Sequence, residues 1–347
     1  MYKKPNIVIV GCGQITRENH LAAALRSPKI QLFALVDNQI ENAQALAKMY
    51  ALNCTISDDL SKVIDSVDGV LIATGNHTHY PIAKVALEKS IPVLIEKPIT
   101  TTYEDAIKLC DLARSNNTFI SVGYRTRYYP SVILFKRLLD KSFFGRINHF
   151  HYECGTRGGW APVSGYNLDR KKAGGGVLVV SGTHFLDRML HWFGEPKEVI
   201  FRDDSYGGVE ANCKAEMIFE NDIGTFTGTF FMSKTIQLTN KFILDSEHYL
   251  CELGEGESQK ITLFLKNDPS VKMEISPNTF NPNQKSIDYF QIQFDEFADN
   301  IIQKGEITVD GWFAARSIKL IEEMYNNRLQ LDEPWILYKH AVRNENV

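Results

Sequence analysis

Apolar and polar residues follow two different patterns along this chain. In the first third, short runs almost without polar positions alternate with segments that have the 3.6-residue periodicity of helices. Runs of this kind are typical of strands buried on both faces of a parallel sheet, and their alternation with helices predicts a doubly wound α/β fold. The predicted strands are residues 6–10, 31–36, 68–73, 92–95 and 118–122, and the predicted helices between them include residues 80–88 and 102–115.

After about residue 125 the pattern changes to strands that follow one another without intervening helices. Their polar and apolar residues alternate, which predicts an antiparallel sheet. We therefore predict a Rossmann domain over residues 1–125 and an α+β domain with a large, mostly antiparallel open sheet over residues 126–347. The predicted strands of the second domain are residues 146–153, 197–202, 211–219, 224–231, 240–245 and 260–265, and two amphipathic helices are expected near residues 286–303 and 310–327.

Composition narrows the class of protein. The 347 residues are 44% hydrophobic and 23% charged, which is ordinary for a soluble globular protein. A net charge of −4 without any basic block argues against nucleic acid or an anionic membrane as a partner. The six cysteines lie far apart and form no C-x-x-C, so neither a metal site nor a disulfide framework is indicated. Without a signal-like or membrane-spanning apolar run, we expect a cytoplasmic protein.

A glycine turn follows the first predicted strand. Gly11 would make the tight turn and Gly13 would let the backbone approach a pyrophosphate, followed by Gln14 and Ile15 at the helix start. Thr16 stands where the fingerprint normally has a third glycine. The second strand ends in Asp37, at the spacing expected for the acid that binds a ribose 2′-hydroxyl. Because Asn38 follows rather than Arg, we predict NAD over NADP; the alternative is that Asp37 caps the next helix.

Two further strands end in polar residues at the same carboxyl edge, where ligands of open α/β sheets bind. One is followed by Thr74, Asn76, His77 and His79, which are explained by a helix start better than by a metal site. The other runs into Glu96-Lys97-Pro98. A lysine there can donate a proton to a carbonyl oxygen or orient an alcohol, although a simple strand cap is an equal alternative.

In the second domain, a helix is predicted from the glycines Gly174–Gly176 to Phe193, with Gly194 as its C-cap. It carries His184 in an otherwise apolar segment. Taken alone, a buried structural histidine paired with Asp187 is the favoured interpretation.

Five motifs occur in a fixed order: the glycine turn, the Asn76 turn, Glu96-Lys97-Pro98, Arg127-x-x-Pro130, and the glycines followed by Gly182-x-His184-x-x-Asp187. With these motifs the chain resembles the Gfo/Idh/MocA oxidoreductase family over nearly its whole length. The resemblance implies that Lys97 contacts the reacting hydroxyl and that His184 is the acid/base. It also implies sugar or cyclitol substrates, and a homodimer or homotetramer packed through the flat sheet face. The cofactor contacts are then assigned to Gly11, Gly13, Gln14, Ile15, Asp37, Asn38, Thr74, Asn76, His79, Glu96, Lys97 and Arg127.

One position departs from the family. Many active members carry Asp four residues before this histidine, where this chain has Val180. Ser181, or an acid from elsewhere such as Asp169, could orient the imidazole instead, or proton transfer could rest mainly on Lys97. We therefore expect Lys97 to be indispensable and His184 to be important but secondary.

Substrate contacts are expected from two loops before the glycines. Trp160 could stack on a sugar ring and Arg157 could bind a carboxylate or phosphate; as equal alternatives, they are a core anchor and a solvated loop residue. The leading hypothesis is an NAD-dependent dehydrogenase of a sugar or cyclitol. Alternatives are a nucleotide-sugar dehydrogenase, a keto-sugar reductase, or a non-catalytic sensor. The predicted substrate-binding residues are Lys97, Arg157, Trp160, Tyr166, Asp169 and His184.

Overall fold

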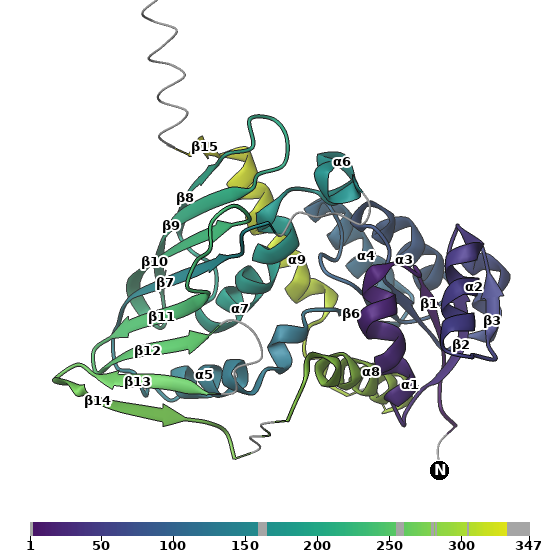
Figure 1. Ribbon diagram of the computed structural model, residues 1–347, viewed down its shortest axis with the longest axis horizontal. Helices are drawn as coiled ribbons and strands as arrows, with labels where there is room; N and C mark the ends of the chain where they lie inside the picture. The colour runs from purple at the N-terminus through teal and green to yellow at the C-terminus, as the bar shows by residue number, and fades with distance from the viewer. Residues whose placement is uncertain are drawn as a thin grey trace, which may run out of the picture.

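The computed structural model describes residues 3–158, 165–254, 260–278, 281, 283–303 and 305–331. Its first sheet has six strands, all parallel, in the order β3-β2-β1-β4-β5-β6 (Figure 1). This arrangement confirms the doubly wound prediction, and β3 is the one strand of this sheet that the sequence pattern did not predict. The strands are β1 (Asn6–Val10), β2 (Gln31–Val36), β3 (Thr55–Ser57), β4 (Gly69–Ile72), β5 (Val93–Ile95) and β6 (Ile120–Val122).

Helices cover both faces of the first sheet. Ile7 and Ile9 of β1 are buried against α1 (Leu21–Arg26) and α2 (Ile40–Met49), whereas Val8 and Val10 point to the opposite side. That side is covered by α3 (His79–Glu88) and α4 (Tyr103–Ser115). Because successive side chains of a strand point to opposite faces, a strand covered on both sides must be apolar throughout.

The last two helices return to the first sheet. On α8 (Ser286–Gln303), Phe290, Phe294 and Phe297 pack with Ile7 and Ile9 on the face that α1 covers. The helix α9 (Gly311–Asn326) packs against α4 and α7, and the N–H of Val122 donates to the carbonyl of Val309 at 3.0 Å. The two halves of the chain are thus joined by a shared core as well as by the connection near residue 125.

The second sheet has nine strands in the order β14-β13-β12-β11-β7-β10-β9-β8-β15. Its pairs are antiparallel except for β10 with β7 and β15 with β8. The sequence pattern missed β12, β14 and β15; nearly every residue of β14 is exposed, so no apolar face marks it. The strands are β7 (Ile147–Gly155), β8 (Glu198–Asp203), β9 (Asn212–Asn221), β10 (Gly224–Ser233), β11 (Lys241–Ser246), β12 (Tyr249–Gly254), β13 (Ile261–Leu265), β14 (Asp268–Ile275) and β15 (Leu329–Gln330).

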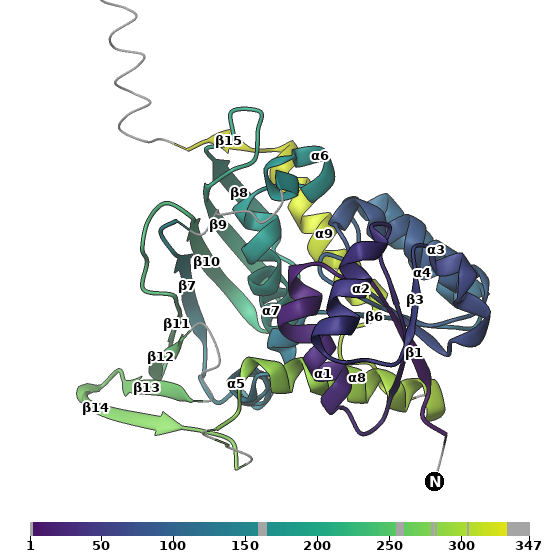
Figure 2. The same ribbon diagram turned by 45° about the vertical axis from the view of Figure 1, so that its right-hand side comes forward.

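One face of the second sheet is covered by α5 (Pro130–Asp140) and α7 (Thr183–Phe193), which lie between the two sheets (Figures 1 and 2). The core there is aromatic: Phe150 of β7 stacks on Phe193 of α7 with ring centroids 5.1 Å apart, and Phe135 of α5 contacts Trp192. Among the described residues, no helix covers the other face in either view. No helix within the described ranges is long and apolar enough to cross a membrane.

Candidate active site

A cleft of about 1140 Å³ opens at the carboxyl ends of β1, β2 and β4. Its walls come from the turn after each of these strands, with a contribution from the segment around Tyr166 in the second half of the chain. The structure therefore brings many of the predicted site residues into one concave site. Those that line it are Gly11, Gly13, Gln14, Ile15, Asp37, Asn38, Thr74 and Tyr166.

The glycine turn has the geometry that a bound pyrophosphate requires. Gly11 has φ +96°, and a Cβ there would lie 2.5 Å from the carbonyl oxygen of Ala73. A Cβ on Gly13 would meet no protein atom within 4 Å, so this backbone is open to the cleft. Thr16, in place of the third glycine, is buried and donates its hydroxyl to the carbonyl of Gly11 at 2.6 Å. The chain there forms one π-helical turn, η1 (Thr16–His20), before α1 begins.

Asp37 closes the far side of the turn. One carboxylate oxygen accepts from the N–H of Cys12 at 2.8 Å, and the other accepts from the N–H of Gln39 at 2.9 Å. The N-cap of α2 is Gln39, so Asp37 does not cap that helix as the alternative interpretation required. Its half-buried carboxylate lies at the edge of the cleft, where it would repel a 2′-phosphate. The glycine turn, the open Gly13 backbone and this acid together fit an NAD molecule.

Lys97 lies just beyond the end of β5 and reaches across to the second half of the chain. Its ammonium donates to the carbonyl oxygen of Val180 at 2.8 Å. Burial lowers the pKa of Lys97 from its ordinary 10.5; the carboxylate of Glu96 opposes this shift, and the charges of Arg125 and Lys234 add to it. A partly desolvated ammonium held in this way is suited to stabilise a developing alkoxide or to exchange a proton with it.

Glu96 fixes the backbone before Lys97. Its carboxylate contacts Nε2 of His20 at 2.8 Å and accepts from the N–H of Lys97 at 3.0 Å. Burial acts to raise the pKa of Glu96, but the hydrogen bond and charge of His20, together with Lys97, outweigh it and lower that pKa below its ordinary 4.5. His20 in turn packs edge-on against Phe290 of α8. The lysine is therefore oriented by a buried pair and by a helix from the other end of the chain.

His184 is the second residue of α7, which directly follows the π-helical turn η7 (Leu178–Gly182). Its ring is half-buried and meets Tyr124 edge-on, with centroids 5.9 Å apart. Among the described residues, its Nδ1 atom has no hydrogen-bond partner, so neither Ser181 nor Asp169 hydrogen-bonds to this atom. Burial, followed by the charges of Lys97, Arg125 and Arg188, lowers the pKa of His184 well below its ordinary 6.5. The imidazole is therefore neutral at physiological pH.

Asp187 is paired with an arginine and not with His184. Its Oδ1 atom accepts from Nη1 of Arg127 at 3.2 Å, and both side chains are buried. The prediction of a structural His184–Asp187 pair is therefore wrong. Burial raises the pKa of Asp187 to about 6, against the opposing charges of Arg127 and Arg188. The Arg127 guanidinium also lies 4.6 Å from the ring centroid of Phe313, so it sits in the core where α7 and α9 meet and does not line the cofactor cleft.

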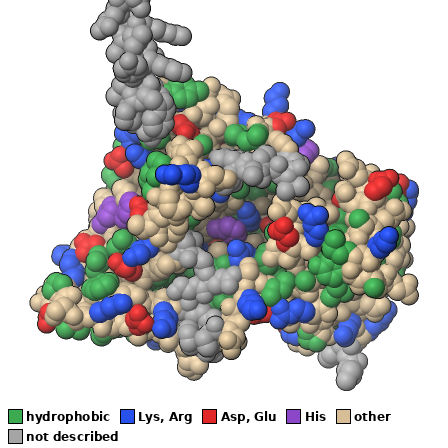
Figure 3. Space-filling model, viewed as in Figure 1, with side chains coloured by type: hydrophobic (Ala, Val, Ile, Leu, Met, Phe, Trp, Pro, Cys, Tyr) green, Lys and Arg blue, Asp and Glu red, His purple; other side chains and the backbone are tan. Residues whose placement is uncertain are grey.

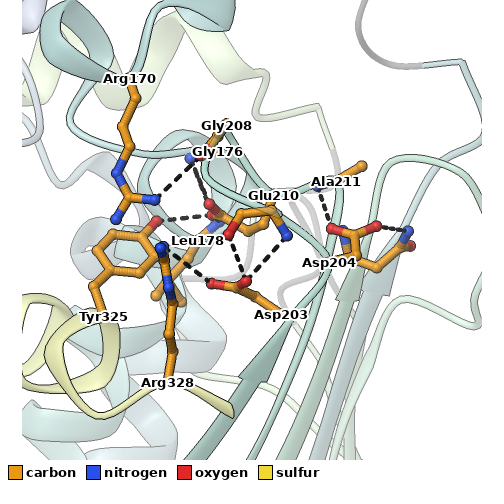
Figure 4. A network of polar contacts seen from close by, with 12 residues as sticks. Arg170, Gly176, Leu178, Asp203, Asp204, Gly208, Glu210, Ala211, Tyr325 and Arg328 are labelled. Atoms are coloured by element: carbon orange, nitrogen blue, oxygen red, sulfur yellow. Dashed lines mark hydrogen bonds and ion pairs between the residues drawn. The ribbon is translucent and has the colours of Figure 1, made fainter. Parts of the chain in front are cut away.

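Glu210 holds the three glycines that precede η7 (Figure 4). Its carboxylate accepts from the N–H groups of Gly176 and Leu178 at 2.9–3.0 Å and from the hydroxyl of Tyr325 at 2.8 Å. A Cβ on Gly176 would lie 2.0 Å from the carbonyl oxygen of Glu210, so only glycine fits. The predicted helix was expected to begin at these glycines, but they lie outside regular helix. Gly174 instead ends α6 (Arg170–Ala173) in a left-handed conformation.

The remaining predicted residues have positions that the sequence could not specify. Asn76 donates to the carbonyl of Ala173 at 2.7 Å and joins the two halves of the chain. His79 is fully buried behind the cleft, with its ring nitrogens 2.8 Å from the carbonyl of Pro98 and 3.2 Å from that of Thr74. Asp169 is the N-cap of α6. The side chain of Arg157 is exposed, and Trp160 lies outside the described residues.

Three residues near this site, His20, Arg125 and Glu210, were not singled out from the sequence. No spacing rule connects residue 20 to residue 96, or residue 210 to residue 176, because both pairs form only when separate elements pack. A weak signal existed for His20, since it is a polar residue that directly precedes the buried Leu21 of α1. Arg125 lies in the motif around Arg127, but nothing in the sequence distinguishes it there as a site residue.

The shifted pKa values predict a pH profile. His184 must be neutral to accept a proton, so activity is lost as the pH falls through its pKa, which lies below 6.5. Lys97 must be charged, so activity is lost as the pH rises through its pKa, which lies below 10.5. We expect kcat/KM to stay near its plateau at pH 6.5, and a His184→Gln variant to lose the acid limb. An acid limb centred at or above pH 6.5 would contradict this assignment.

This fold, with a cleft and a glycine turn at the carboxyl edge of a parallel sheet, defines the class as a dinucleotide-binding protein. Residues 5–124 match the family model described as an oxidoreductase family with an NAD-binding Rossmann fold, and residues 136–330 match the C-terminal alpha/beta domain of the same family. The chain belongs to the Gfo/Idh/MocA oxidoreductase family. This finding confirms the resemblance seen in the sequence motifs and the expected NAD-binding domain.

Individual relatives are distant. D-glucoside 3-dehydrogenase of Escherichia coli is 26% identical over 240 residues, covering 69% of this chain and 68% of that protein. Inositol 2-dehydrogenase 4 of Saccharopolyspora erythraea is 30% identical over 157 residues, covering 44% and 46%. Levoglucosan dehydrogenase in complex with NADH and levoglucosan has a TM-score of 0.82 at 18% identity, over 94% of this chain and 97% of that one. This last likeness supports the fold alone.

Proposed function

We propose that this oxidoreductase is an NAD-dependent dehydrogenase that acts on a secondary hydroxyl of a sugar or cyclitol. The hydrogen bond from Lys97 to the carbonyl of Val180 carries the proposal. It brings the lysine at the edge of the cofactor-binding sheet to the turn that leads into His184, so a proton donor and a proton acceptor lie near each other at this edge. The relatives that act on a glucoside and on inositol support this substrate class.

The reaction needs a hydride acceptor and a path for the hydroxyl proton. When bound, NAD supplies the hydride acceptor. A hydride leaves the carbinol carbon readily only as the hydroxyl proton is removed, which the neutral imidazole of His184 can do. The Lys97 ammonium stabilises the negative charge that develops on the oxygen. Glu96 and His20 hold the backbone of Lys97, and Glu210 holds the turn that precedes His184, so both groups are positioned before the substrate binds.

The experiment is to follow NADH formation with a panel of free sugars, inositols, sugar phosphates and nucleotide sugars. We expect turnover on one of these subclasses. Silence across the panel in both directions, with NAD binding intact, would refute the proposal and favour a binding protein without turnover.

Asp37 should set the preference for NAD over NADP. Removing its charge in Asp37→Ser should improve the NADP/NAD affinity ratio by about 10- to 100-fold, because a carboxylate beside a 2′-phosphate costs a few kcal/mol at an effective dielectric between those of water and a protein interior. Dissociation constants from protein fluorescence measure this ratio. Asp65→Ser makes the same charge change on an exposed residue and should leave the ratio unchanged. If Asp37→Ser and the wild type had the same NADP/NAD affinity ratio, Asp37 would not be a residue of the ribose site.

We also propose a homo-oligomer that packs through the face of the second sheet without helices. Ile200 of β8 and Ile218 of β9 are exposed there by 46% and 40%. Ile218→Lys should raise the subunit dissociation constant at least about tenfold, because it buries a charge in the contact. Sedimentation velocity measures the mass, with the exposed Met49→Lys on α2 as the control. An oligomer that Ile218→Lys leaves intact would place the contact elsewhere.

A further inference from the structure

Positive charge gathers around the candidate catalytic pair. The charges of Arg125 and Lys234 both help to lower the pKa of Lys97, and the charge of Arg125 also helps to lower the pKa of His184. In the space-filling view the molecule is hollowed at its centre, and histidine together with lysine or arginine side chains is visible inside the hollow (Figure 3). The proposed hydride transfer needs only one of these cations.

Lys234 reaches this region from the end of β10. Its backbone N–H donates to the carbonyl of Ala211, and its carbonyl accepts from the N–H of Gly158 at 3.2 Å, so it borders the loop expected to bind substrate. Met232, two residues earlier and therefore on the same face of the strand, would be 2.7 Å from a Cβ on Gly182, in the turn before His184. The half-buried Lys234 side chain thus faces the same side as the catalytic turn.

Arg125 reaches the region from the opposite side. Its backbone follows Gly123, whose N–H donates to the carbonyl of Ile95 at 2.8 Å, directly before Glu96-Lys97. The guanidinium lies between the rings of Tyr129 and Phe290, at 5.7 and 5.5 Å from their centroids, and donates to the hydroxyl of Ser286 at 3.2 Å. These contacts orient the group without neutralising it.

Within the part of the chain that the structure describes, no carboxylate balances these two cations. Among the described residues, neither Arg125 nor Lys234 has an acidic group within 4.0 Å. The nearby carboxylates are engaged elsewhere, Glu96 with His20 and Asp187 with Arg127. The diphosphate of NAD would lie at the glycine turn of β1, and the nicotinamide end of the cofactor carries no anion.

We propose that the substrate is an anionic sugar derivative whose carboxylate or phosphate binds Lys234 and Arg125 while its hydroxyl meets Lys97 and His184. This inference rests on the proposed dehydrogenase function and specifies its substrate class. Lys234 supplies a point charge, and the guanidinium offers a planar pair of donors that fits either anion.

The bound anion also affects the chemistry. In the free protein burial, followed by the charges of Lys97, Arg125 and Arg188, lowers the pKa of His184, which makes it a weak base. A carboxylate or phosphate beside the cations raises that pKa toward its ordinary value and makes the imidazole a stronger base. The acid limb of kcat, which reports the substrate complex, should therefore lie at higher pH than the acid limb of kcat/KM, which reports the free enzyme. A neutral sugar should show no such separation.

The test compares D-glucose, D-glucuronate and D-glucose 6-phosphate, with the galacto and manno equivalents, as substrates with NAD. We expect at least one uronate or phosphate to exceed its neutral parent at least about tenfold in kcat/KM. Lys234→Gln should raise KM for that substrate about 10- to 100-fold, as expected for the loss of a charged hydrogen bond, and this rise should be at least about tenfold larger than any rise for the neutral parent. Lys272→Gln on the distant strand β14 removes the same charge and is the control.

The outcomes separate this inference from the proposed function. A preference for the uronates over the phosphates identifies a carboxylate as the anion, and the reverse identifies a phosphate. Turnover of neutral sugars that equals that of the anions, and that Lys234→Gln leaves unchanged for both, would overturn the inference and leave the dehydrogenase standing. If no sugar is turned over, the anion site is tested instead by the affinity of D-glucuronate and D-glucose 6-phosphate for the NADH complex. A loss of binding in Lys234→Gln supports the anion site, and unchanged or absent binding in both proteins refutes it.

Discussion

Lys97→Met should lower kcat at least about 10³-fold while the melting temperature and the affinity for NAD stay close to wild type. Proton transfer from a positioned side chain contributes about 10²–10⁴, and one electrostatic donor to a developing oxyanion about 10²–10³. Lys97 combines both roles, because its ammonium is held by the carbonyl of Val180 and partly desolvated beside the cleft. Methionine preserves the packing of the aliphatic stem and removes only the charge and the donor.

The effect of Lys97→Met is best compared with that of His184→Ala. The histidine has no hydrogen-bond partner at Nδ1 among the described residues, so no protein carboxylate strengthens it as a base. We expect its loss to cost about 10²-fold in kcat, less than the loss of Lys97. The exposed Lys171→Met serves as a control for lysine replacement. If Lys97→Met kept near-normal turnover while His184→Ala abolished it, the two residues would exchange roles.

Gly11→Ala should weaken NAD binding at least about tenfold and lower the melting temperature of the protein without cofactor by about 4 °C. The backbone has φ +96°, and the new Cβ would lie 2.5 Å from the carbonyl oxygen of Ala73, which cannot move without shifting β4. Strain of about 3 kcal/mol is expected from a left-handed alanine that also meets backbone. Differential scanning fluorimetry, with and without NAD, measures both effects.

Gly13→Ala is the matched control for the same turn. Its Cβ would meet no protein atom within 4 Å, so the melting temperature of the cofactor-free protein should not change. NAD binding should still weaken, because the methyl group points into the space where the pyrophosphate approaches. A Gly13→Ala variant that binds NAD normally would show that the cofactor does not approach this backbone.

The candidate site could be predicted from the sequence only where a motif is local. The glycine turn, Asp37 and Lys97 each follow a buried strand directly, and the rule that ligands bind at the carboxyl edge places them together. Glu96 is buried with His20 across 76 residues, and Arg127 takes Asp187 as its partner. Such pairs depend on which helices pack together, which no spacing in the sequence encodes. For that reason the sequence paired Asp187 with the wrong residue.

For this protein, the sequence by itself determined the class of fold, the two kinds of sheet, the position of the glycine turn and the family. These follow from periodicity and turn chemistry, which act over a few residues. Only the tertiary structure decided that α8 packs on the first sheet, that Val180 contributes its backbone oxygen to Lys97, and that Arg125 and Lys234 have no carboxylate partner among the described residues. Burial and charge balance depend on every element that surrounds a group, so they exist only once the chain has folded.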